Sequence, residues 1–116
     1  MKVYHKSIGF PEGLNLPEVL ALEVSYTRHG LLRAKQYKVN RPKKLFFFKS
    51  SLLEVHVTKR GNISKLIFRT SYSKKKDIVY VIGFVLCGFK AKVVTLWLND
   101  KKDKHFTLKK DKYSKP

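Results

Sequence analysis

The sequence predicts an α+β fold: one or two N-terminal helices packed on a four-stranded antiparallel β-meander. Two observations lead to it. Helix-start signals occur in the first third. From residue 52 onward, turns separate strand-like segments, of which the first alternates between apolar and polar residues and the later ones are apolar on both sides. A chain of 116 residues suits one hydrophobic core. We therefore expect a single domain with an irregular and helical part over 1–44, a sheet over 45–99 and a C-terminal extension over 100–116.

The N-terminal third contains signals for a short strand and two helices. Residues 2–4 can form the strand, and Pro17 can start a short helix over 18–23. Thr27 is a suitable N-cap for a helix over 28–37, because its hydroxyl can accept a hydrogen bond from a free backbone N–H of the first turn. The side chains expected to face the core from that helix are Leu31, Leu32 and Ala34.

The rest of the chain favours strands. Residues 52–59 alternate cleanly between apolar and polar, which predicts a strand with one buried face. Arg60-Gly61-Asn62 is typical of a hairpin turn. Three further strands are expected over 63–72, 77–86 and 92–99. The run Phe46-Phe47-Phe48 either packs beneath this sheet or adds an edge strand to it.

The charge balance favours a polyanionic partner. Lys and Arg number 26 against 8 Asp and Glu, a formal net charge of +18. Solubility of a small domain needs a net charge of only ~2–8, whereas binding to phosphates releases counterions and gains affinity from a large positive charge. Most of these residues are lysines, which also serve solubility alone. The charge therefore predicts contact with nucleic acid without selecting a target.

The sequence also limits the compartment and the cofactors. The single cysteine, Cys87, lies in an apolar run and is expected to be a small buried hydrophobe. No apolar leader and no apolar stretch of ~20 residues is visible, so we expect a cytoplasmic protein with no membrane partner. Cys, His, Asp and Glu are too sparse for a zinc site, and we expect no metal and no cofactor.

His29 and Arg33 are the best candidates for chemistry. RNA cleavage without a metal needs a base for the ribose 2′-OH, an acid for the leaving oxygen and cations around the phosphate. Histidine can do the first two tasks because its pKa is ~6.5, and arginine binds phosphate oxygens bidentately. His29 and Arg33 are four residues apart and share one face of the expected helix. The alternative is an exposed histidine beside a solvated arginine.

Other candidates lie in the expected strands and turns. Arg69 interrupts an apolar strand, and His105 follows the last strand. Trp97 shares a strand face with Thr95, either as a platform on which a base stacks or as a core residue. The expected catalytic residues are His29, Arg33, Arg69 and His105. The expected nucleic-acid-binding residues are His56, Thr95, Trp97, Lys74, Lys75 and Lys76.

One segment resembles a known family; it reads Ser25-Tyr26-Thr27-Arg28-His29-Gly30-Leu31-Leu32-Arg33-Ala34. It is similar to the Tyr-x-x-His-x-x-x-Arg helix start of small phage and mobile-element proteins in the barnase/EndoU/colicin/RelE-like ribonuclease superfamily. The closing strands and tail of related proteins resemble the segments 77–82 and 93–99, Asp103-x-His105-x-Thr107-Leu108 and Tyr113. The resemblance covers residues 24–113. It implies a helix before a four-stranded antiparallel meander.

The resemblance also implies active-site roles for His29 and Arg33, with Arg69, Thr95 and His105 as further candidates. The leading hypothesis is a metal-independent endoribonuclease, toxin-like or phage-encoded, in which His29 is base or acid and His105, before His56, is its partner. RNA, including ribosome-associated RNA, is the expected substrate, and an antitoxin or inhibitor protein is a further expected partner. The alternative is a non-catalytic basic protein that binds nucleic acid or a host factor, with salt-dependent binding and no turnover.

Overall fold

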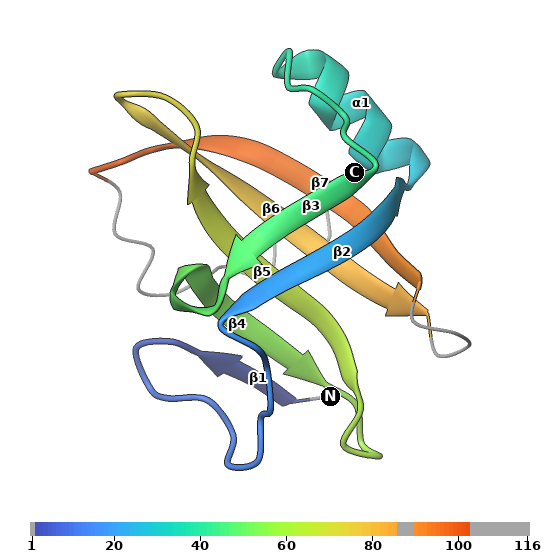
Figure 1. The fold of residues 1–116 in the computed structure, drawn as a ribbon, viewed down its shortest axis with the longest axis vertical. Helices are drawn as coiled ribbons and strands as arrows, with labels where there is room; N and C mark the ends of the chain where they lie inside the picture. Colours follow the sequence, from blue (N-terminus) through green and yellow to red (C-terminus); the bar gives the residue numbers. More distant parts are fainter. Residues whose placement is uncertain (1, 86–89, 103–116) are drawn as a thin grey trace.

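The computed structural model describes residues 2–85 and 90–102 (Figure 1). In this part of the chain, seven strands form a mixed sheet in the order β1-β4-β5-β6-β7-β2-β3, with one α-helix, α1. The elements are β1 (Lys2–His5), β2 (Val19–Tyr26), α1 (Arg28–Gln36), β3 (Lys44–Phe48), the 3₁₀ turn η1 (Lys49–Ser51), β4 (Leu52–Val57), β5 (Ile63–Ser71), β6 (Lys76–Val85) and β7 (Lys90–Asp100).

The predicted fold class is wrong, although its meander exists inside the larger sheet. Strands β4 to β7 pair antiparallel in sequence, as expected. They are extended by β1 on one side and by β2 and β3 on the other, and β2 runs parallel to β7. The segment 18–23, expected as a helix, lies mostly in β2. Its side chains follow a period of two, because Leu20 and Leu22 pack on the core while Ala21 and Glu23 are exposed.

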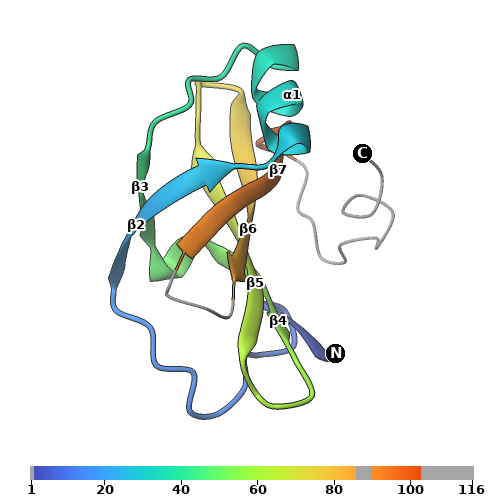
Figure 2. The ribbon, with the colours of Figure 1, turned by 90° about the vertical axis from the view of Figure 1, so that its right-hand side faces the viewer.

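The sheet curls over itself and encloses the main core. Strands β2 and β3 cross in front of the meander in Figure 1, and in the side view of Figure 2 β3 lies apart from β5 and β6. Phe47 of β3 spans this space: its ring stacks on Phe68 with 4.3 Å between centroids and meets Tyr80 edge-on at 5.4 Å. The phenylalanine run is thus an edge strand within the described residues, with Phe47 buried and its two neighbours exposed.

Helix α1 follows β2 directly and lies beside β7. The predicted N-cap is confirmed: the Thr27 hydroxyl accepts a hydrogen bond from Gly30 N at 3.0 Å and donates one to Val94 O at 2.8 Å. Thr27 thereby ties the start of the helix to the neighbouring strand. α1 has nine residues, and none of the described helices combines the length and apolar character needed to cross a membrane.

The helix packs through small residues, so the expected core position of Ala34 is confirmed and those of Leu31 and Leu32 are wrong. Leu31 and Leu32 are 39% and 58% exposed, whereas Gly30 and Ala34 are buried. A Cβ on Gly30 would clash with the backbone carbonyl oxygen of Val93. The helix therefore lies too close to β7 for large side chains on this face.

A bulge in β7 determines which side chains reach the candidate site. Val81 pairs with Thr95 and Ile82 with Val93, so Val94 is an extra residue in the strand. We call the side of the sheet facing the main core its inner face and the opposite side its outer face. Beyond the bulge, Thr95 and Trp97 lie on the outer face, next to a small buried cluster of Ile67, Val79 and Val81.

Candidate functional site

A pocket of about 260 Å³ lies between α1 and the end of β7. The alternation of β7 after its bulge brings every second side chain, from Thr95 to Asn99, to the same face. On the opposite wall, Arg33 and Tyr37 are four residues apart, one helical turn. The residues lining the pocket are Arg33, Tyr37, Thr95, Leu96, Trp97 and Asn99.

His29 is not among the residues that line this pocket, but it contacts Arg33, which is one of them. Arg33 Nε donates a hydrogen bond to His29 Nε2 over 3.4 Å, and Arg33 Nη1 donates another to Gln36 Oε1 over 2.9 Å. Partial burial, and then the positive charge of Arg33, lower the pKa of His29 below its usual 6.5. The imidazole is therefore neutral at pH 7, with an acceptor lone pair on Nε2. A neutral histidine beside an arginine can accept a proton where an anion is held.

Thr95 and Trp97 form the strand wall of the pocket. Thr95 is only 3% exposed, and its cross-strand neighbour Val81 is fully buried. Trp97 packs on the apolar cluster of the outer face, as a core residue would, and it also lines the pocket. An indole with one side in the core is held rigidly, as a platform for stacking must be.

Arg69 belongs to the same face but is engaged in a partly buried ion pair. It lies in a cross-strand row with Val79 and Trp97, two strands away from the pocket wall. Its Nε donates to Asp77 Oδ2 over 2.7 Å, and its Nη2 donates to the carbonyl oxygen of Asp100 over 2.9 Å. This geometry makes Arg69 a residue that positions the end of β7, next to Asn99, rather than one that lines the pocket.

Asp77 completes this cluster on β6. Burial alone would raise the pKa of the Asp77 carboxyl, but hydrogen bonds and charge from Arg69 and Lys101 outweigh it, so the pKa is lowered. Lys101 Nζ lies 3.2 Å from Asp77 Oδ1. The cluster thus holds the carboxylate ionised and joins the end of β7 to β5 and β6.

Asp77→Asn is expected to lower the free energy of unfolding at pH 7 by about 1–3 kcal/mol, because it leaves Arg69 without its charged partner. The pKa of the Asp77 carboxyl is lower in the folded protein than in the unfolded chain, where it is ~3.9. The stability that the ionised carboxylate contributes is therefore complete above pH ~3.9 and is lost as the pH falls through the folded-state pKa. Urea unfolding at pH 7 and pH 3 measures this. The difference in stability between the two proteins should be full at pH 7 and smaller at pH 3, and the exposed Glu12→Gln is the control that should match the parent at both.

His56 is not part of the pocket. Its Nε2 lies 2.7 Å from Glu54 Oε1, and both side chains are buried on β4. His56 pairs in the sheet with Lys65 of β5. Strands β5 and β6 therefore lie between His56 on β4 and the pocket strand β7. His105 lies outside the described residues. Among those that are described, no three side chains of the metal-binding types converge.

The lysines of the β5–β6 turn lie near the end of the pocket strand. Lys74, Lys75 and Lys76 are exposed, and Lys76 pairs in the sheet with Asp100, the residue after Asn99. The carbonyl oxygen of Lys75 accepts a hydrogen bond from the backbone of Lys101. These lysines therefore add positive charge at the same end of the sheet as the pocket.

Sequence reasoning missed two polar residues of the pocket, Tyr37 and Asn99. Both could have been found from residues that were chosen, since Tyr37 is four residues after Arg33 and Asn99 is two residues after Trp97. Gln36, which accepts a hydrogen bond from Arg33, had no signal in the sequence. Applying the helix period once more from Arg33, and the strand period once more from Trp97, would have identified both.

Comparison with known proteins gives no match: no family model, no curated protein and no solved structure is similar to this chain.

Proposed function

We propose that the protein is a metal-independent endoribonuclease whose active site is the pocket between α1 and β7. The observation that carries the proposal is the contact between His29 and Arg33, because Arg33 also lines a pocket that contains a tryptophan. A neutral histidine supplies a base, an arginine supplies a phosphate ligand, and an indole supplies a surface for a nucleobase. The net charge of +18 supplies attraction for a polyanion.

In the proposed reaction, His29 Nε2 takes the proton from the ribose 2′-OH. The 2′-oxygen attacks the adjacent phosphorus, the bond to the 5′-oxygen breaks, and a 2′,3′-cyclic phosphate forms. Arg33 turns from His29 to the non-bridging phosphate oxygens, where negative charge develops. The lowered pKa of His29 keeps the base unprotonated near neutral pH.

The leaving 5′-oxygen needs a proton, and His105 remains the predicted donor. His56 is a poorer candidate because Glu54 holds it on β4, away from the pocket lining. The side chains of Thr95 and Asn99 offer hydrogen bonds to the sugar or base beside Trp97. We place this activity in the cytoplasm on RNA, including ribosome-associated RNA, with an antitoxin or inhibitor protein as the partner that a toxin-like enzyme requires.

Incubation of the purified protein with total RNA in EDTA is expected to produce fragments ending in 2′,3′-cyclic phosphate. Mass spectrometry of the fragment ends measures this directly. An RNA in which every 2′-OH is methylated is the control and should stay intact, because the attacking group is blocked. Cleavage that needs added divalent metal, or that leaves 5′-phosphate ends, contradicts the proposal.

A non-catalytic nucleic-acid-binding protein is the second candidate, favoured by the charge alone. The same incubation distinguishes it, because binding without turnover leaves the RNA intact while retarding it in a gel. Its affinity should fall steeply with salt concentration.

A further inference from the structure

A second concave site lies on the other side of β2 from the main core. Its volume is about 640 Å³, and it is lined by Glu23, Val24, Ser25, Lys43, Lys44, Ala91 and Lys92. It forms where β2 leaves its pairing with β3 and begins its pairing with β7, as the neighbours Glu23–Lys44 and Ser25–Lys92 show. Three lysines against one glutamate give this lysine hollow a net positive charge.

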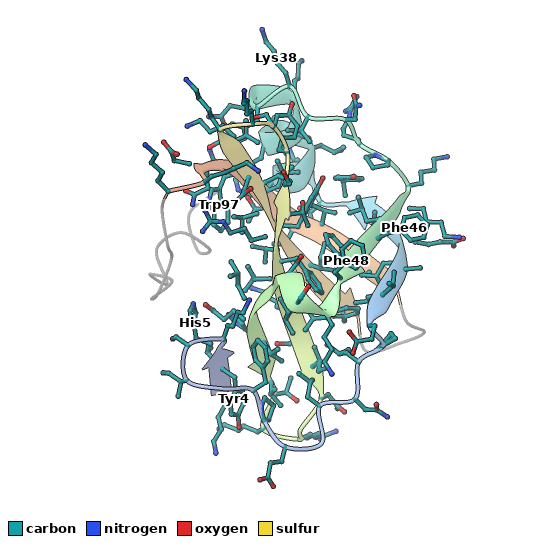
Figure 3. All side chains as sticks on the ribbon, turned by 60° about the vertical axis from the view of Figure 1, so that its left-hand side comes forward. Tyr4, His5, Lys38, Phe46, Phe48 and Trp97 are labelled. Atoms are coloured by element: carbon teal, nitrogen blue, oxygen red, sulfur yellow. The ribbon has the colours of Figure 1, made fainter. Side chains whose placement is uncertain are left out.

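An exposed aromatic ring borders the lysine hollow. Phe46 is 63% exposed and points away from β3 and from the core, as Figure 3 shows. Lys44 Nζ lies 5.8 Å from the centroid of its ring. The residue opposite Phe46 on β2 is Ala21, whose small side chain leaves the space beside the ring open. Lysines next to an unburied ring combine charge for phosphates with a surface for bases.

We infer that the lysine hollow and Phe46 bind a single-stranded nucleic acid, with a phosphate among Lys43, Lys44 and Lys92 and a base on the Phe46 ring. That this strand is the RNA substrate of the enzyme rests on the proposed function. The site then holds the part of the RNA that extends beyond the scissile bond, which makes a polynucleotide rather than a dinucleotide the preferred substrate.

The chain connects the lysine hollow to the pocket by short segments. Ser25 lies four residues before His29, and Lys92 lies three residues before Thr95 on the same strand. Three strand residues span about 10 Å, before the bulge shortens that length. A strand of RNA that leaves the pocket past His29 therefore meets the lysine hollow within a few nucleotides.

A second copy of this chain is a poorer occupant of the same surface. Pairing of two β3 edges would bring Lys43, Lys44 and Lys49 of both copies together around Phe46. Like charges placed opposite each other in a sheet are destabilising. A negatively charged strand instead relieves the repulsion among these lysines.

The inference is tested by measuring how tightly the protein binds a short 2′-O-methyl oligouridylate. Fluorescence anisotropy gives the affinity at each of a series of salt concentrations. The methyl groups prevent cleavage, so binding is measured in the unmodified protein. The triple variant K43Q/K44Q/K92Q should bind at least ~10-fold more weakly, with a salt slope smaller by about 0.7, because the contact with one phosphate contributes ~0.7 for a single strand. Phe46→Ala should weaken binding ~10-fold at an unchanged slope, because stacking involves no counterion.

The matched control removes the same charge elsewhere. Lys2, Lys59 and Arg60 are exposed near the β4–β5 turn, away from α1 (Figure 1). The variant K2Q/K59Q/R60Q should bind more tightly than the hollow variant. Equal affinities and equal salt slopes for the two triple variants would overturn the inference. Competition by polyglutamate that is as strong as competition by unlabelled oligouridylate would also overturn it.

Cleavage of a dinucleotide separates this inference from the proposed function. The hollow and Phe46 variants should cleave it at the parent rate, since it fills only the pocket, and a loss of that activity contradicts the separate site. If the parent itself cleaves no RNA, the proposed function fails, while the anisotropy measurements still decide whether the lysine hollow binds a strand.

Discussion

Replacing His29 with Ala should lower kcat/KM for RNA cleavage by about 10²–10⁴, because a positioned general base contributes that much to proton transfer. His29 touches the rest of the pocket through Arg33, and its side chain is half-buried at the beginning of α1. Its loss should leave the fold and the affinity for RNA nearly unchanged. Single-turnover cleavage and anisotropy binding, measured on the same preparation, separate the two effects.

The dependence of kcat/KM on pH tests the role of His29 further, because a purely structural histidine would not set the midpoint of this profile. Because the pKa of His29 is lowered, the acidic limb of kcat/KM should have its midpoint below pH 6.5. Arg33→Gln removes one of the two causes, the positive charge, so the midpoint should move upward while burial still acts on the imidazole. The parent is then more active than this variant at every pH, and the difference is largest in acid.

Two controls delimit the histidine assignment. His5 lies on β1, at the opposite edge of the sheet from β3, and His5→Ala should cleave RNA at the parent rate. His105→Ala should lower the rate of RNA cleavage, because His105 is the predicted general acid. His56→Ala should cleave RNA at the parent rate, provided that this variant is folded. Parent-like activity of His29→Ala in EDTA would falsify the assignment of the base.

Local patterns predicted those parts of the fold whose partners are close in sequence. The β4–β7 meander and the Thr27 cap depend on hairpins and on one helical turn, and both are present. Strand β2 was missed because Leu, Ala and Glu after Pro17 favour a helix, while its burial follows a period of two. Its parallel pairing with β7 joins residues about 70 positions apart, as Val24 and Ala91 show, and no local pattern encodes that.

In the candidate site, too, the contacts between residues close in sequence could be predicted and the contacts between distant segments could not. His29 and Arg33 are neighbours through helical spacing, and Thr95 and Trp97 share a face through strand alternation, so the sequence could indicate each pair. The meeting of the two pairs depends on the packing of α1 beside β7. Arg69 was a further candidate because of its position in an apolar strand, but its guanidinium is paired with Asp77 on the next strand. Strand alternation does not reveal a cross-strand partner of this kind.

Gly30→Ala should destabilise the protein and disable the site, although alanine in a helix is ordinarily favourable over glycine by up to ~1 kcal/mol. Here the added Cβ meets the carbonyl oxygen of Val93, a backbone atom that cannot rotate away. We expect a net loss of about 1–3 kcal/mol in the free energy of unfolding, as in overpacked cores, measured by urea titration. The helix must also move away from β7, which displaces Arg33 from Thr95 and Trp97.

That displacement sets the effect on activity, because a shift of ~1 Å in a positioned group can cost ~10²-fold in rate. Leu32→Ala is the matched control: Leu32 lies in the same helix, is 58% exposed and should keep parent stability and cleavage when replaced. A Gly30→Ala protein that unfolds at the parent urea concentration and cleaves RNA normally would show that α1 does not need its close approach to β7. If instead only cleavage falls, the contact positions Arg33 without stabilising the fold, and the pocket depends on a glycine that never touches the substrate.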